Sequence, residues 1–177
     1  MKSANRILRI AITGPESTGK STLCRQLASY YHTIWVPEYA RTYIDNLNRN
    51  YQEQDLIEIA KGQLDLEAIH SRKAQRFIFC DTELLVIKIW SMHKYGRVDP
   101  RILTMCNEIS YDLYLLTKPD LSWQYDKQRE NPSKGDYFFQ LFIDELLTKK
   151  ANFKIIEGKN EKRLMSAVDM IKNTLSG

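Results

Sequence analysis

Apolar residues along the chain gather in five short runs, and the longer stretches between them repeat their apolar positions every three or four residues. A short apolar run is typical of a buried strand, whereas the longer spacing is typical of an amphipathic helix. The runs predict strands at residues 7–13, 33–36, 77–81, 112–116 and 153–157. Because these strands alternate with helices, we expect an α/β fold built on a five-stranded parallel sheet.

The spaced stretches predict helices that cover both faces of this sheet. They fall at residues 20–31, 40–47, 51–73, 83–93, a piece after Pro100, 137–149 and 161–175. In the longest helix, a row of apolar residues recurs at intervals of four and is expected to face the core: Leu56, Ala60, Leu64 and Ala68. Folds of this class bind ligands beyond the carboxyl ends of their strands, so the chemistry is expected there.

The connection between the first strand and the first helix is a candidate phosphate site. It runs Gly14-Pro15-Glu16-Ser17-Thr18-Gly19-Lys20-Ser21, the GxxxxGK[ST] pattern of a P-loop, or Walker A motif. Glycines allow the tight turn that aims backbone N–H groups at phosphates, while Lys20 adds charge and Ser21 can ligate Mg²⁺. We expect ATP to contact Gly14, Glu16, Ser17, Thr18, Gly19, Lys20, Ser21 and Thr22, with Lys159 in the turn at residues 158–160 placed for the adenine.

The third strand ends in an acid, Asp81, after four apolar or small residues. This is the pattern of a Walker B carboxylate, which holds the magnesium shell beside the P-loop serine. Asp81 also precedes a predicted helix, where an acid is favoured as the N-cap. We assign it a metal or substrate role, with which a capping role can coexist.

The second strand ends at Glu38, within Glu38-Tyr39-Ala40-Arg41-Thr42-Tyr43. A carboxylate here can accept a proton from the hydroxyl of an acceptor substrate or hold a ribose hydroxyl, and Arg41 would add positive charge. The alternative is a surface ion pair, which stabilises little. Tyr39 and Tyr43 either stack on a base or pack within the protein, and both are kept as candidate substrate-binding residues. Whether Glu38 or Asp81 is the general base stays open.

A long polar connection covers residues 118–136 and contains two prolines and a glycine. Connections of this length are usually functional or disordered. Phosphoryl transfer needs a cation that closes over the migrating group, and a mobile lid carrying Arg129 would supply it, with Lys127 as the second candidate. Trp123 is expected to cover the substrate. The alternative is a solvated charged loop.

The same connection begins with Thr117-Lys118-Pro119-Asp120, which looks like the guanine-reading T/N-K-x-D element of GTPases. A GTPase would also need a glycine at the third residue after its metal-binding Asp, where this chain has Leu84. We therefore interpret the element as a coincidence at the start of the lid.

Composition narrows the function classes further. The net charge of +4 comes without a Lys/Arg-rich block, which gives little support for nucleic-acid binding. The three cysteines show no metal-binding spacing and are expected to be reduced and buried. No apolar run approaches the ~20 residues of a membrane span. We expect a single cytoplasmic domain over residues 1–177, without membrane contact or an evident partner protein.

Taken together, these elements resemble the ribosylnicotinamide kinase domain of NadR-type NAD-biosynthesis proteins, within the P-loop nucleoside and nucleotide kinases. The resemblance is carried by GPESTGKSTL, Glu38-Tyr39-x-Arg41-x-Tyr43, FCDTE, the Tyr111-Asp112 strand and the segment from Trp123 to Arg129. It implies a P-loop kinase fold with strand order 2-3-1-4-5. It also implies transfer of the γ-phosphate of ATP, with Mg²⁺, to the 5′-hydroxyl of nicotinamide riboside, giving nicotinamide mononucleotide.

Residue roles follow from the same resemblance. Phosphates and metal would be held by Lys20 and Ser21, metal or ribose by Asp81, the acceptor by Glu38 and Arg41, and the lid would close through Arg129. Two departures stand out. The HxGH motif of the N-terminal adenylyltransferase domain that such proteins often carry is absent here, so the resemblance concerns the kinase part alone. The family often has a Trp directly before the Glu, able to stack on nicotinamide, where this chain has Pro37.

Two alternatives remain. A deoxynucleoside or thymidylate kinase is the nearest enzymatic one, although those families usually place an Arg directly after the third-strand acid, where this chain has Thr82. The other is a regulatory module that binds ATP or GTP without an acceptor. The charges of the lid and of the acceptor side argue against that module.

Overall fold

A computed structural model describes residues 6–175, so the ends of the predicted domain, residues 1–5 and 176–177, lie outside the described residues. Its sheet contains β1 (Leu8–Thr13), β2 (Trp35–Val36), β3 (Phe77–Asp81), β4 (Leu113–Thr117) and β5 (Phe153–Ile156). All neighbouring strands are parallel, and their order is β2-β3-β1-β4-β5. The predicted fold class and strand order are confirmed.

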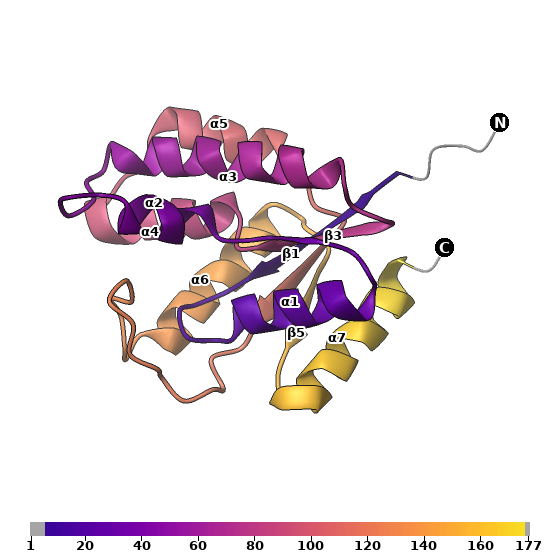
Figure 1. The fold of residues 1–177 in the computed structure, drawn as a ribbon. Helices are drawn as coiled ribbons and strands as arrows, with labels where there is room; N and C mark the ends of the chain where they lie inside the picture. The colour runs from indigo at the N-terminus through magenta and orange to yellow at the C-terminus, as the bar shows by residue number, and fades with distance from the viewer. Residues whose placement is uncertain (1–5, 176–177) are drawn as a thin grey trace.

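The described residues also contain seven helices, six of them between strands and the last after β5. They are α1 (Lys20–Tyr30), α2 (Tyr39–Asp45), α3 (Asp55–Ser71), α4 (Leu84–Tyr95), α5 (Pro100–Glu108), α6 (Gly135–Thr148) and α7 (Asn160–Leu175). In Figure 1, α1 and α7 lie together, while α3 and α5 run side by side next to α2 and α4. Residues 118–134 form neither helix nor strand, in agreement with the irregular connection predicted there.

The two faces of the sheet have separate cores. Ile10 and Ile12 of β1 point to the face where Leu27 of α1 and Val168 of α7 pack. Ala11, between them, points to the opposite face, which α4 and α6 cover. This alternation follows from the two-residue period of a strand, and it explains why β1 is apolar on both sides. Because all five strands are parallel, their carboxyl ends lie at one edge of the sheet, between the helical layers.

One prediction about the core is wrong. The expected apolar row of α3 does not continue to Ala68, which is exposed. The buried face instead continues through two polar residues, Gln63 and Glu67, each 2% exposed. Their hydrogen bonds to other buried groups make this burial possible, which a count of apolar spacing cannot detect.

The cysteine prediction is confirmed. Cys24, Cys80 and Cys106 are free and buried, and burial raises the pKa of the Cys106 thiol to about 12. Among the helices of residues 6–175, none combines the length and the apolar character needed to cross a membrane.

Candidate functional site

A cavity of about 560 Å³ opens at the carboxyl ends of the strands. The P-loop forms one wall, and α2, α4, α6, the 118–134 segment and the start of α7 form the others. Three kinds of residue line it: the P-loop backbone, a group of charged side chains, and an apolar end. The charged group contains Glu16, Lys20, Glu38, Arg41, Arg129, Lys159 and Arg163. Its position beyond the strand ends agrees with the binding site expected for a parallel α/β sheet.

The P-loop owes its shape to two glycines. Gly14 (φ 134°) and Gly19 (φ 77°) adopt backbone angles that other residues rarely take. A Cβ on Gly14 would also lie 2.6 Å from the Thr117 hydroxyl oxygen, so β4 packs directly against the loop. The Thr18 hydroxyl, predicted to contact ATP, is used inside the protein, where it donates to the Pro15 carbonyl at 2.8 Å and contacts the Thr117 hydroxyl at 2.6 Å.

Lys20 begins α1, and its Nζ donates to the Pro15 carbonyl at 2.6 Å, which holds the ammonium group over the loop. Burial lowers the pKa of Lys20, and the nearby carboxylates of Glu38 and Asp81 oppose this shift. The structure therefore brings together the P-loop lysine and the two acids that the sequence places at the ends of β2 and β3.

Asp81 ends β3, next to β1 and the P-loop, and is 2% exposed. Burial raises the pKa of its carboxyl, an effect that the Ser21 side chain opposes. The N-cap of α4 is Glu83, whose carboxylate accepts from the Leu85 N–H at 2.6 Å, so the capping role considered for Asp81 belongs to another residue. Among the described residues, Asp81 Oδ1 finds no hydrogen-bond partner. A buried, unpartnered carboxylate oxygen beside a serine suits a Mg²⁺ ligand set.

The residue after Asp81 holds the end of β3 in place. Thr82 has a left-handed backbone conformation (φ 67°), which is uncommon for a β-branched residue. Its N–H donates to the Ile12 carbonyl at 3.0 Å, which ties the end of β3 to the end of β1.

Glu38 and Arg41 line the same cavity from the start of α2. The Glu38 carboxylate lies 3.9 Å from Arg41 Nε and stays half-buried. Burial raises the pKa of Glu38; Lys20 acts against this shift, and Asp81 reinforces it. A carboxylate with a raised pKa at the cavity wall is suited to taking up a proton.

Tyr39 and Tyr43 do not line this cavity. The Tyr39 ring lies so close to Gly62 that a Cβ there would come within 2.0 Å of it, and the Tyr43 hydroxyl donates to Asp55 at 3.1 Å. Both side chains pack against α3, which corresponds to the packing alternative of the sequence interpretation. They fix α2 to α3, and through it the placement of Glu38.

The 118–134 segment is bound to the P-loop through two side chains. The Ser17 hydroxyl accepts from the Gln124 N–H at 2.9 Å and from Arg129 Nη1 at 3.3 Å. The Glu16 carboxylate accepts from the Asn131 N–H at 3.1 Å. These contacts place Arg129 on the cavity wall. Glu16 and Ser17 thus position the segment, whatever contacts they also make with phosphates.

The same segment is joined to α2 on the far side of the cavity. Asp126 accepts from Arg41 Nη1 at 2.8 Å, and the predicted second lid cation, Lys127, pairs with Asp45 at 2.6 Å. Trp123 does not line the main cavity but a smaller one of about 200 Å³ between the segment and the P-loop. The segment therefore spans the cavity from the P-loop to α2, with Arg129 inside, Lys127 directed to α2 and Trp123 behind.

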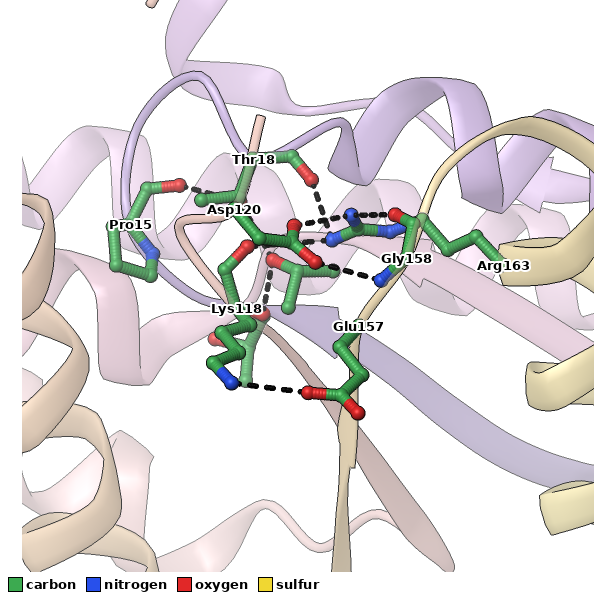
Figure 2. A network of polar contacts seen from close by, with 9 residues as sticks. Pro15, Thr18, Lys118, Asp120, Glu157, Gly158 and Arg163 are labelled. Carbon is green, nitrogen blue, oxygen red and sulfur yellow. Dashed lines mark hydrogen bonds and ion pairs between the residues drawn. The ribbon is translucent and has the colours of Figure 1, made fainter. Parts of the chain in front are cut away.

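Sequence reasoning missed Arg163, the centre of the network in Figure 2. This arginine of α7 is 5% exposed, and its guanidinium donates at 2.8 Å to Asp120 Oδ1, at 2.8 Å to the Gly158 carbonyl and at 2.9 Å to the Thr18 carbonyl. It joins the P-loop, the start of the 118–134 segment and the turn after β5. No motif surrounds it, and its distance in sequence from all three segments hides its role.

Asp120 is fully engaged in this network. Its Oδ2 accepts from the Gly158 N–H at 2.6 Å, while Oδ1 accepts from Arg163. Burial acts to raise the pKa of Asp120, but these donors outweigh it and hold the pKa below its usual value. Because both oxygens are occupied, the carboxylate is not free to read a guanine, which supports the interpretation of the T-K-x-D pattern as a coincidence.

Figure 2 also provides a matched pair of ion pairs for mutagenesis. We expect Arg163→Met to lower the free energy of unfolding by about 2–4 kcal/mol, because one buried and two partly buried acceptors lose their donor. Lys118→Met, which breaks the exposed Lys118–Glu157 pair (3.0 Å), should change it little. Urea unfolding of both variants measures the difference. Equal losses of unfolding free energy would show that Arg163 stabilises the fold no more than the exposed ion pair does.

The apolar end of the cavity was also missed. Its lining comes from α4 and α6 and consists of Val86, Ile89, Trp90, Phe138 and Phe142. The Trp90 Nε1 atom is buried and has no hydrogen-bond partner among the described residues. Helical spacing within residues 83–93 cannot single out Trp90, because a residue at a cavity wall has the same spacing as one in the core.

Comparisons with known proteins agree with the fold. The trifunctional NAD biosynthesis/regulator protein NadR of Salmonella typhimurium is 28% identical over 176 residues, which cover 94% of this chain and 42% of that protein. Two solved structures of NadR protein, one with NAD and AMP-PNP and one with NR, are each 20% identical to this chain. Their TM-scores are 0.80 and 0.81. Each match covers 97% of this chain, and it covers 50% of the first NadR chain and 51% of the second. The chain thus spans less than half the length of the curated relative.

A family model described as an AAA domain matches residues 9–163, from β1 to the first turn of α7. The matched range includes the P-loop, Glu38, Asp81 and the 118–134 segment, as well as the Arg163 hub. The chain therefore belongs to this family of AAA domains.

Proposed function

We propose that this protein is an ATP-dependent kinase that phosphorylates the 5′-hydroxyl of nicotinamide riboside to give nicotinamide mononucleotide. The observation that carries the proposal is that Lys20 of the P-loop lies close to the carboxylates of Glu38 and Asp81, with Lys20 and Glu38 lining one cavity. A P-loop alone supports nucleotide binding, whereas a half-buried carboxylate across from it supports an acceptor hydroxyl. The similarity to NadR, including a NadR structure with NR, supports the choice of acceptor.

In this proposal the P-loop N–H groups and Lys20 bind the phosphate chain of ATP. The turn after β5, where Lys159 and Asn160 line the cavity, contacts the adenine. Glu38 accepts the proton of the 5′-hydroxyl while the hydroxyl oxygen bonds to the γ-phosphorus of ATP. The bond between that phosphorus and the β–γ bridging oxygen breaks at the same time, and ADP leaves with the electron pair.

The acceptor side and the metal follow from the same geometry. Arg41 lies beside Glu38 and orients the acceptor, while the apolar end around Trp90 receives its ring. Ser21 and Asp81 would hold Mg²⁺, because the free Asp81 Oδ1 fits the oxygen ligands that this ion prefers. When bound, Mg²⁺ neutralises charge on the phosphate oxygens.

The 118–136 segment acts as the lid in this proposal. Arg129 already lies on the cavity wall, within reach of the Ser17 hydroxyl of the P-loop. Closure would bring its guanidinium onto the transferring phosphoryl group and exclude water, with Trp123 as part of the cover.

A panel of acceptors with ATP and Mg²⁺ tests the proposal: nicotinamide riboside, deoxynucleosides and nucleoside monophosphates. We expect nicotinamide riboside to be converted with the highest kcat/KM. Turnover confined to thymidine or thymidine monophosphate would reject the proposed acceptor in favour of a thymidine or thymidylate kinase. Tight GTP binding without any phosphorylated product would instead indicate a regulatory nucleotide-binding module.

A further inference from the structure

The first N–H of α2 has an unusual partner. The first N–H groups of a helix have no intrahelical acceptors, and the side chain of the N-cap residue commonly accepts from the second or third of them, which leaves the first to other partners. Here the Tyr39 N–H donates instead to Gln63 Oε1 of α3, at 2.9 Å. Gln63 is 2% exposed. Its buried amide makes this contact with α2 and one further hydrogen bond, to Glu67.

Glu38, the residue that precedes α2, makes no capping bond with its side chain. Its carboxylate stays at the cavity wall, 3.9 Å from Arg41 Nε. A carboxylate in this position would ordinarily fold back onto the N–H groups of the first turn. The Tyr39 N–H belongs to the peptide group that joins Glu38 to Tyr39, so its bond to Gln63 ties the backbone beside Glu38 to α3.

The orientation of the Gln63 amide is set from the other side. Its Nε2 donates at 3.3 Å to Oε1 of Glu67, which is buried and also accepts from the Tyr111 hydroxyl at 2.8 Å and from Arg9. An ionised carboxylate can only accept, so the NH₂ end of Gln63 must face it and the oxygen must face α2. In the hydrogen bonds that link Arg9 of β1 to Tyr39 of α2, every donor therefore faces an acceptor.

We propose that Gln63 is a positioning residue for phosphoryl transfer: by holding the Glu38–Tyr39 peptide group against α3, it fixes the backbone from which the Glu38 carboxylate reaches the cavity. This inference rests on the proposed function. Tyr39 assists, because its ring packed on Gly62 holds the start of α2 at hydrogen-bonding distance from α3. Gln63 itself does not line the cavity.

Gln63→Met tests the proposal, since methionine has a similar shape and cannot form the bond. We expect kcat with the acceptor that the panel identifies to fall by about tenfold or more, because a misdirected base loses its near-attack geometry. The KM for ATP should stay within about twofold, as the P-loop is untouched. Ser91→Ala is the control: it removes the hydrogen bond of another buried side chain, from Ser91 Oγ to the Arg97 carbonyl at 2.7 Å, outside the Glu67 network and α2, and it should leave kcat unchanged within about twofold.

Wild-type kcat in Gln63→Met, or an equal loss in Ser91→Ala, would overturn the positioning role. Amide hydrogen exchange supplies a readout that needs no substrate. In the wild-type protein the Tyr39 N–H should exchange slowly although it begins a helix, and fast exchange would show that the cap is absent.

The two readouts also separate this inference from the proposed function. If no acceptor of the panel is phosphorylated but the Tyr39 N–H is protected, the proposed function fails and the positioning role fails with it, while the cap remains as structure. If the wild-type enzyme is active and Gln63→Met is equally active, only the positioning role fails.

Discussion

Replacing Glu38 with glutamine should lower kcat by about 10²–10⁴-fold, the range that removal of a general base usually costs. Glutamine keeps the size of the side chain but cannot accept the proton of the 5′-hydroxyl. The raised pKa that burial gives Glu38 makes it a better proton acceptor, which increases the expected loss. ATP affinity should change far less, because Glu38 precedes α2 and is not part of the P-loop backbone. Steady-state kinetics and ATP titration give the two numbers.

Glu157→Gln is the control for this substitution. Glu157 is also a carboxylate at the carboxyl end of a strand, but it is exposed and pairs with Lys118. Its replacement should leave kcat unchanged. A Glu38→Gln enzyme with near wild-type turnover would remove Glu38 as the base and leave Asp81 as the other carboxylate of the site.

Lys20→Ala should abolish measurable transfer, with a loss of at least about 10³-fold in kcat/KM. The ammonium group is buried above the P-loop, where charge on the terminal phosphates is stabilised most strongly. Its loss also removes one of the cations that lie near Glu38 and Asp81, which disfavours a phosphate chain further. Product formation with saturating ATP measures the effect.

Lys118→Ala, at an exposed position on the same edge of the sheet, is the control for this second variant. Circular dichroism of both variants checks that they fold. Retention of more than about a tenth of wild-type turnover in Lys20→Ala would contradict the role of Lys20, since a P-loop lysine contributes several kcal/mol to the transition state.

The parts of the site that sequence predicted are those whose pattern is local. The P-loop is contiguous, and Glu38 and Asp81 each follow a short apolar strand, so parallel topology alone brings them to one edge. Even there, direction was not predictable: Tyr39 and Tyr43 occur in the same element as Glu38 but face α3.

The parts that sequence could not predict depend on contacts between distant segments. Gln63 and Glu67 interrupt an apolar row, and only the three-dimensional structure reveals their partners Tyr39 and Tyr111. Arg163 lies 145 positions from Thr18, and nothing near it in sequence distinguishes it from an exposed arginine of α7. Buried polar networks of this kind are specified by geometry rather than by residue spacing.

The central claim is that phosphate moves from ATP to the 5′-oxygen of nicotinamide riboside. The most direct measurement follows γ-labelled ATP with the wild-type enzyme, Mg²⁺ and nicotinamide riboside, and identifies the labelled product. We expect the label in nicotinamide mononucleotide, with one ADP formed for each. Label that remains in ATP, or that appears only as inorganic phosphate, would contradict the account.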